Sequence, residues 1–194
     1  MDIFTLDIPQ SRSWSDDELF EFCAANKELR IERDKNGYII VMSPSGGFSS
    51  HCNSIVQGEL YIWNKANRFG KIFDSSGGIL LADGSMRAPD LAFLSKEQWN
   101  SLKENEKSQF LPICPDFIVE VRSKTDRLNV LQQKMEAWIS NGCKLAWLID
   151  PLEKKAYVYS PIKEVNVISG FDQKLSGEDI LPNFEFDLSL LLKA

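Results

Sequence analysis

The chain has 194 residues, of which 43% are hydrophobic and 26% are charged, a composition typical of a globular protein with a proper core. This length favours one domain, and we expect residues 1–194 to form a single one. The 28 acidic residues outnumber the 22 lysines and arginines, and the net charge of −6 argues against a surface coated in positive charge for nucleic acid, although a local basic groove is still compatible with it.

The N-terminus predicts one capped helix. The first 14 residues lack the basic segment and the long apolar segment of a secretory signal, so we do not expect a signal peptide. Ser15 precedes three acidic residues in a pattern that matches a capping box. A helix is therefore predicted from there to about Asn26, as a support for a sheet.

A hairpin is predicted next. Residues 29–33 alternate apolar and polar side chains, and residues 38–42 form the return strand. The turn between them contains Asn36-Gly37, which supplies the positive φ angles of a tight hairpin. Glu32 lies on the first strand, where we expect it to face solvent.

The middle of the chain predicts a long helix between two loops. The loop at 43–47 lacks the lysine and hydroxyl residue of a phosphate-binding loop. A helix is predicted over 49–66, and Glu59 on it is either an accessory acid or part of a solvated face. His51 is the only histidine, and without a Gly-x-Ser-x-Gly elbow a polar contact is favoured over a catalytic role.

The remaining elements alternate strand and helix. Residues 117–121 and 144–149 are predicted as buried strands joined by a helix over 128–140, an order typical of a parallel crossover. The other expected elements are strands at 71–74, 79–81 and 89–94, a short helix from Ser95 to Leu102, an exposed loop at 103–108, a hairpin of 156–159 with 164–168, and a strand with a last helix in 184–192. The sequence predicts an α/β (α+β) domain whose sheet edge is extended by hairpins.

The cysteines and the apolar segments bear on the class of protein. Cys23, Cys52, Cys114 and Cys143 are scattered without a Cys-x-x-Cys pair, which argues against zinc and favours reduced thiols of a cytoplasmic protein. No apolar run approaches the roughly 18 residues that a membrane span needs, so no membrane partner is expected.

Two acids at the ends of predicted strands mark a candidate site. Asp90 enters one strand and Glu120 interrupts another, and neighbouring strands would bring both to one spot. Two carboxylates suit Mg²⁺ or Mn²⁺. Arg122 follows by two positions and Lys134 lies on the next helix, so acids and cations together suit metal-assisted phosphodiester cleavage. The structural alternative is a turn cap at Asp90 and a salt bridge between Glu120 and Arg122.

Five segments occur in an order that resembles the Uma family of putative restriction endonucleases, abundant in cyanobacteria and part of the PD-(D/E)XK nuclease superfamily. They are Leu29-Arg30-Ile31-Glu32, Met42-Ser43-Pro44-Ser45-Gly46-Gly47, Arg87-Ala88-Pro89-Asp90, Pro115-Asp116-Phe117-Ile118-Val119-Glu120-Val121-Arg122-Ser123 and Trp147-Leu148-Ile149-Asp150-Pro151. The resemblance covers nearly the whole chain, from about Trp14 to Leu192.

The resemblance implies a restriction-endonuclease-like core, a mixed β-sheet flanked by helices. It makes Asp90 and Glu120 the two metal-binding acids of the superfamily motif, with Mg²⁺ or Mn²⁺ as cofactor and DNA as substrate. The place of the motif lysine on the strand is held by Arg122, which departs from the superfamily pattern. Members of the family often carry that lysine on the following helix, and Lys134 matches this position, with Arg122 as helper or substitute.

Three functions remain open at this point. The first is a metal-dependent endonuclease that hydrolyses DNA, for which a homodimer is expected because cutting both strands needs two sites. The second is a catalytically inactive DNA- or protein-interaction module on the same fold, which the acidic charge and the absent strand lysine motivate. The third is a hydrolase of another phosphate ester, because fold analogy alone does not fix the substrate.

Overall fold

The computed structural model describes residues 4–6 and 14–193, so most of the N-terminal stretch that we expect not to be a signal peptide lies outside the described residues. The helices are α1 (Asp16–Ala25), α2 (Gly47–Asn67), α3 (Lys96–Ser101) and α4 (Leu128–Ser140), with 3₁₀ turns η1 (Glu106–Ser108) and η2 (Leu188–Lys193). The strands are β1 (Phe4–Leu6), β2 (Arg30–Arg33), β3 (Ile39–Met42), β4 (Gly70–Asp74), β5 (Ile79–Leu80), β6 (Met86–Arg87), β7 (Leu91–Ser95), β8 (Phe117–Val121), β9 (Leu145–Asp150), β10 (Lys155–Tyr159), β11 (Asn166–Ser169), β12 (Lys174–Ser176) and β13 (Glu185–Asp187).

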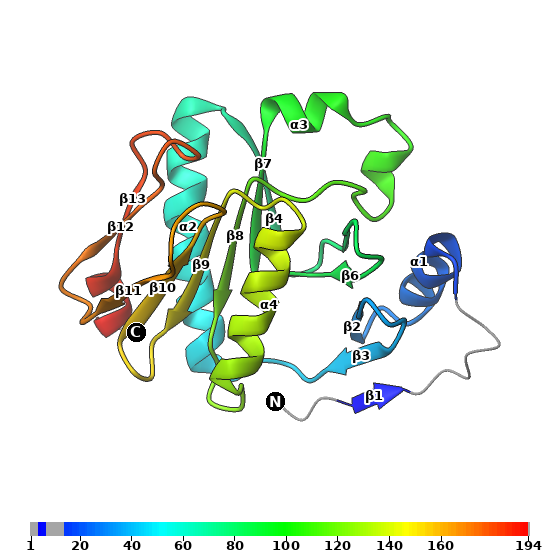
Figure 1. Ribbon diagram of the computed structural model, residues 1–194, viewed down its shortest axis with the longest axis horizontal. Helices are drawn as coiled ribbons and strands as arrows, with labels where there is room; N and C mark the ends of the chain where they lie inside the picture. Colours follow the sequence, from blue (N-terminus) through cyan, green and yellow to red (C-terminus); the bar gives the residue numbers. More distant parts are fainter. Residues whose placement is uncertain (1–3, 7–13, 194) are drawn as a thin grey trace.

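A six-stranded mixed sheet in the order β11-β10-β9-β8-β7-β4 forms the centre of the fold (Figure 1). β8 and β9 are parallel, as the crossover through α4 predicts, and the other neighbouring strands are antiparallel. The antiparallel register of β7 and β8 joins Leu91 to Val119, so the residue that enters β7 lies beside the end of β8. This pairing brings the two predicted acids to the same end of the sheet.

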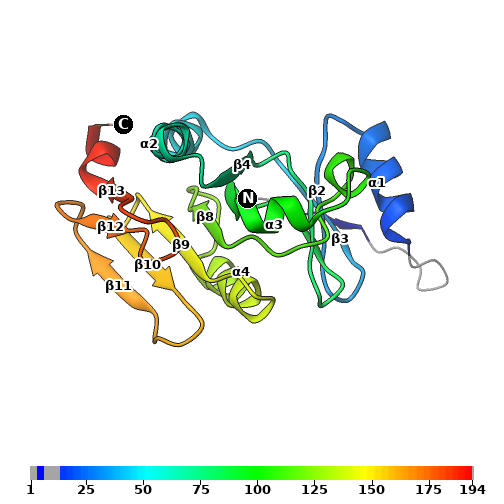
Figure 2. The same cartoon turned by 90° about the horizontal axis from the view of Figure 1, so that it is seen from above.

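Helices α2 and α4 cover opposite faces of this sheet, as Figure 2 shows from above. Phe117, Val119 and Val121 of β8 pack in the same cluster as α2, and Ile118 packs with α4. Because successive side chains of a strand point to opposite faces, Glu120 is on the α4 side with Ile118. The strand therefore directs its only carboxylate toward the helix that carries Lys134.

A second sheet, in the order β1-β3-β2-β6-β5, lies beside the first, next to α1 (Figure 1). The predicted N-terminal hairpin is confirmed, but it contributes to this separate sheet, whereas the β10–β11 hairpin does extend the edge of the central one. β2 pairs with β3 on one side and β6 on the other, and its last three residues are buried. The small β12–β13 hairpin packs with α2 over the central sheet.

The turn of the N-terminal hairpin differs from the prediction in one detail. Only Gly37 adopts a positive φ, of 89°, while Asn36 does not. Asp34 accepts a hydrogen bond from the amide of Gly37, and its own amide donates to the carbonyl of Tyr38. This is the pattern of a three-residue loop that ends in a left-handed glycine, not of a two-residue turn.

Candidate active site

Asp90 enters β7 at the end of the sheet where β8 finishes. Its side chain is 13% exposed, its Oδ2 accepts a hydrogen bond of 2.9 Å from the amide of Val121, and its Oδ1 lies 3.8 Å from the guanidinium of Arg30. Asp90 thus bridges two neighbouring strands and does not cap a local turn. The Val121 amide also fixes the orientation of this carboxylate.

Glu120 lies one residue before the end of β8, and its side chain is 7% exposed. The Lys134 ammonium is 2.7 Å from its Oε1, so the two side chains form a close ion pair. The proposed alternative of a Glu120–Arg122 salt bridge is not observed. The partner of Glu120 comes from α4, on the face to which the strand alternation directs it.

Lys134 is held between two carboxylates from different sheets. Its Nζ is 2.7 Å from Glu120 of β8 and 2.9 Å from Glu32 of β2, and its side chain is 13% exposed. It lies one position before Met135, which is fully buried against the central sheet. The side chain therefore crosses from the edge of the apolar face of α4 into the acidic cluster.

Burial and these contacts shift the pKa values of Glu120, Asp90 and Lys134. Burial raises the pKa of Glu120 to about 7, and the charges of Asp90 and Glu32 add to this shift, while Lys134 opposes it. Burial also raises the pKa of Asp90, against the Val121 amide and the charges of Lys134 and Arg30. Burial alone would lower the pKa of Lys134, but Glu120 and Glu32 outweigh it and raise that pKa, so the ammonium stays charged at neutral pH.

Glu32 is a site residue that the sequence reasoning placed wrongly. It was expected to face solvent, but it is 2% exposed, because β2 lies inside the second sheet. Its Oε2 accepts a hydrogen bond from Arg87 at 3.0 Å, and its Oε1 accepts from Lys134 and from the amide of Ala88 at 3.1 Å. The Lys134 and Arg87 charges overcome burial, which alone would raise the pKa of Glu32, and lower it.

A signal for Glu32 is present in the sequence. Arg30 and Glu32 are two residues apart on one strand and so share a face, and Arg87 precedes Asp90 by three residues. Both Arg30 and Arg87 prove to pair with acids of the cluster. Two opposite charges on one face of the strand, with Ile31 and Arg33 on the other, are the signal in the sequence.

The structure does not bring Arg122 into the site. Its guanidinium Nη1 is 2.6 Å from Oδ2 of Asp150, whose side chain is fully buried, and its Nε donates to the carbonyl of Asp126 at 3.4 Å. β8 ends at Val121, so the alternation that would direct Arg122 toward Glu120 stops one residue earlier. Arg122 instead links the ends of β8 and β9.

A cavity of about 1280 Å³ contains the cluster and is lined by both sheets and by α4. Among the described residues, seven carboxylates and five cationic side chains line it, a formal balance of −2. The acids are Glu32, Asp34, Asp83, Asp90, Glu120, Asp126 and Glu136, and the cations are Arg30, Lys35, Arg87, Arg127 and Lys134. The cavity is wide enough for a nucleotide-sized group, but its walls do not by themselves attract a polyanion.

The donor set fits a hard divalent cation. Asp90 and Glu120 supply oxygen donors, and burial raises the pKa of each, so their charged forms lack solvation that a divalent ion would replace. In the part of the chain that the structure describes, no group of three or more His, Cys, Asp or Glu side chains is arranged to hold a metal. A metal would therefore have to complete its shell with water and substrate, as Mg²⁺ commonly does.

Other candidates of the sequence lie elsewhere. His51 is exposed in the first turns of α2 and does not line the cavity. Glu59, on α2, does not line it either. The four cysteines are free. Among the described helices, none is long and apolar enough to cross a membrane.

Comparison with known proteins identifies the family and the fold. The family model described as Uma2, putative restriction endonuclease, matches residues 16–190. The crystal structure of a putative nuclease of family DUF820 from Anabaena variabilis superposes with a TM-score of 0.73 at 20% identity, over 84% of this chain and 89% of the other. No curated protein matches the chain. The fold is thus the one that this nuclease adopts, and the chain belongs to the Uma2 family of putative restriction endonucleases.

Proposed function

We propose that the chain is a metal-dependent endonuclease that hydrolyses phosphodiester bonds of DNA. The observation that carries the proposal is the meeting of Asp90, Glu120 and Lys134, from two strands and a helix, in one cavity. Two buried acids and a charged lysine are the groups that phosphodiester hydrolysis requires. Membership in a family of nucleases supports the same reaction class.

Asp90 and Glu120 would hold Mg²⁺ or Mn²⁺. Bound there, the ion would neutralise charge on the scissile phosphate and lower the pKa of a water molecule. The hydrogen bond from the Val121 amide to Asp90 orients this carboxylate before any ligand arrives. Burial raises the pKa of Glu120 to about 7, so a metal ion would compete with a proton for this carboxylate below neutral pH.

Lys134 supplies the cationic group, and Arg122 does not. Because its pKa is raised, Lys134 is protonated at neutral pH and acts by its charge and its hydrogen bonds, not as a base. Glu32 is a positioning residue, because it holds the ammonium 2.9 Å from its own Oε1 and within reach of Glu120. The two carboxylates fix Lys134 beside the place where a phosphate would lie.

Plasmid nicking with Mg²⁺ or Mn²⁺ tests the proposal. Asp90→Asn and Glu120→Gln should each abolish cleavage, because each removes a metal-binding carboxylate and keeps the shape of the side chain. Glu136→Gln is the matched control, since Glu136 also lines the cavity from α4 but is exposed. Cleavage that survives Asp90→Asn in a folded protein would overturn the assignment.

An inactive interaction module is the second candidate, and the position of Arg122 favours it, because the strand cation of the superfamily motif is turned away. Calorimetry separates the two functions, with Mn²⁺ titrated into wild type and Glu120→Ala, with and without DNA. Binding that vanishes in the variant supports the nuclease. Absence of binding under both conditions supports the module.

We also propose that two copies act together on duplex DNA, since each copy has one acidic cluster. Sedimentation of the protein with and without a duplex measures this. A protein that stays monomeric on DNA while it cuts both strands would contradict it.

A further inference from the structure

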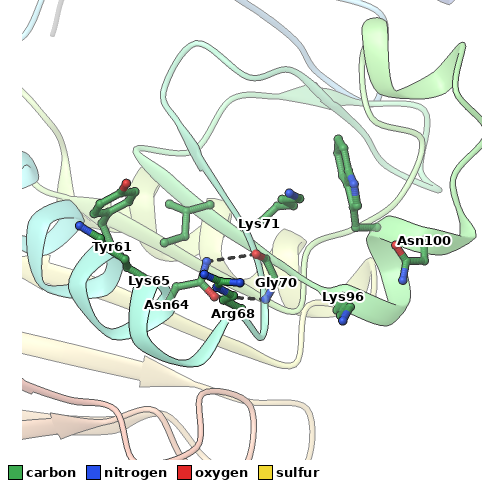
Figure 3. Close-up of a pocket in the computed structure, with 10 residues that line it drawn as sticks. Tyr61, Asn64, Lys65, Arg68, Gly70, Lys71, Lys96 and Asn100 are labelled. Atoms are coloured by element: carbon green, nitrogen blue, oxygen red, sulfur yellow. Dashed lines mark hydrogen bonds between the residues drawn. The ribbon is translucent and has the colours of Figure 1, made fainter.

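A second cavity, of about 640 Å³, lies at the opposite end of the β4–β7 pair, where α2 ends and α3 begins (Figure 3). Asp74 pairs with Leu91 at the end near Asp90, whereas Gly70 pairs with Ser95 at this end, roughly 14 Å away along the strands. Four cations line it, namely Lys65, Arg68, Lys71 and Lys96, and among the described residues no carboxylate does. This group is called the basic pocket below.

The positive charge of the basic pocket is not neutralised by the protein. Each of its four cations is exposed, and none forms an ion pair within the described part of the chain. Lys107 nearby behaves differently, because it lies 5.2 Å from the centre of the Trp99 ring and pairs with Glu104 at 2.7 Å. Lys71 also lies over Trp99, at 5.8 Å, but it has no acidic partner.

The loop beneath the pocket is firmly built. The Asn64 side chain accepts a hydrogen bond from the Gly70 amide at 3.1 Å and donates one to the Gly70 carbonyl at 3.0 Å, as the dashed lines in Figure 3 show. A β-carbon at Gly70 would lie 2.0 Å from the carbonyl oxygen of Leu94, so only glycine fits. The cations on either side are therefore attached to fixed backbone.

Arg68 occupies a position where glycine is the usual residue. It follows α2 with φ 55° and ψ 39°, the left-handed conformation that glycine adopts without a steric cost. The chain keeps a cation there, against this backbone preference. Lys154, Glu178 and Asn183 also adopt a positive φ, so this conformation alone does not mark a binding residue. It does mean that glycine can replace Arg68 without backbone strain.

The charge distribution indicates a polyanion as the ligand. The cavity around Asp90 and Glu120 has a formal balance of −2 and the whole chain of −6, so neither attracts DNA. Protein affinity for nucleic acid comes mainly from lysine and arginine at phosphates. The four cations come from α2, its C-cap, β4 and α3, so they are spread over several elements and suit successive phosphates better than a single small anion.

We propose that the basic pocket binds the phosphodiester backbone of a nucleic-acid segment, as a contact separate from the acidic cavity. The choice of nucleic acid among polyanions rests on the proposed function. The binding itself does not depend on cleavage.

Anisotropy of a fluorescent DNA duplex, measured in EDTA over a range of NaCl concentrations, tests this inference. Arg68→Gly and Lys71→Gln should each weaken binding several-fold and lower the slope of log K against log salt by about one. Arg68→Gly should at the same time melt at or above the wild-type temperature, which separates lost binding from lost folding. Lys27→Gln, which removes an exposed cation after α1, is the matched control and should bind as wild type does.

The outcomes are distinct. Three results would each overturn the inference. Both pocket variants could bind as wild type does, wild type could fail to bind, or inorganic pyrophosphate at the same phosphate concentration as DNA could compete with it. Plasmid nicking by wild type decides the proposed function separately. If wild type nicks plasmid and the pocket variants bind DNA normally, the proposed function stands and the inference is wrong. If wild type does not nick and the pocket variants bind poorly, the inference stands and the proposed function is wrong.

Discussion

Glu120 is a residue whose proposed role in the site lowers the stability of the fold. A carboxylate inside the core is costly in its charged form, and burial raises its pKa to about 7 although Lys134 is 2.7 Å away. The protein thus accepts an acid that is poorly stabilised when ionised. Such a cost is common at sites that must bind a cation.

The cost of burying Glu120 should appear as a pH dependence of the stability of the metal-free protein. Between pH 4.5, the usual value, and about 7 the folded protein binds more protons at Glu120 than the unfolded chain, so metal-free stability falls as pH rises through this window. Glu120→Gln removes the titration, and its stability relative to wild type should increase from pH 5 to pH 8, by at most on the order of 3 kcal/mol. Urea denaturation in EDTA at both pH values measures this, and a constant difference between the two proteins would contradict it.

At the scale of elements, the ends of β8 and β9 are joined by side chains as well as by backbone pairing. Arg122 reaches the fully buried Asp150, whose Oδ1 also accepts hydrogen bonds from the amides of Leu152 and Glu153. The strand that carries Glu120 is thereby fixed to the turn after β9. We infer that Arg122 stabilises the end of β8 and takes no part in the reaction.

Replacing Arg122 tests this role. Arg122→Met leaves a buried charge at Asp150 and should cost roughly 3 to 5 kcal/mol of unfolding free energy. The double variant Arg122→Met with Asp150→Asn should recover part of that loss, and nicking per folded molecule should be unchanged in both. Lost nicking with intact stability would instead place Arg122 in the chemistry.

A pair of glycines gives a second prediction at this scale. Gly70→Ala pushes a β-carbon to 2.0 Å from the Leu94 carbonyl and 2.7 Å from the Phe93 ring, and should destabilise by about 3 kcal/mol or more. Gly58→Ala in the interior of α2 meets no atom within 4 Å and should stabilise by about 0.5 to 1 kcal/mol. Thermal melts of both variants check the two signs. Equal effects would mean that the approach of β4 to β7 is not tight.

The sequence predicted some of these elements closely because their signals are local. β8 and α4 occur as predicted, since an apolar run and a helical face ended by Asn-Gly need no distant partner. β6 and the β12–β13 pairing were missed, because segments of two or three residues are too short to show a strand pattern. β6 also depends on its distant pairing with β2. The capping box at Ser15 is likewise local, and it is confirmed.

At the scale of the whole molecule, the candidate site joins two sheets. Asp90 and Glu120 belong to the central sheet, Glu32 to the second one, and Lys134 connects them. The meeting of Asp90 and Glu120 could be expected from two strand ends. The burial of Glu32 has only the charges of Arg30 and Arg87 as its signal in the sequence, because β6 pairs with β2 through a single residue pair that the sequence does not reveal.

This arrangement predicts that the second sheet tunes the acid of the first. Glu32→Gln removes a charge that raises the pKa of Glu120 and leaves Lys134 to Glu120 alone. Both changes lower the pKa of Glu120, so the pH-dependent fall in metal-free stability should move to lower pH. Urea denaturation across pH 4 to 9 measures the midpoint, and Glu136→Gln serves as control. An unmoved midpoint would show that the two sheets are electrostatically independent.

The position of Glu32 also matters for how fragments of this chain are judged. A fragment that begins after β3 would keep Asp90, Glu120 and Lys134, the residues that the sequence pattern singles out. Without β2 the fragment would lack Glu32, one of the two carboxylates that hold Lys134. Shortened versions of the chain should therefore keep residues 30–33, so that Lys134 keeps both of its acidic partners.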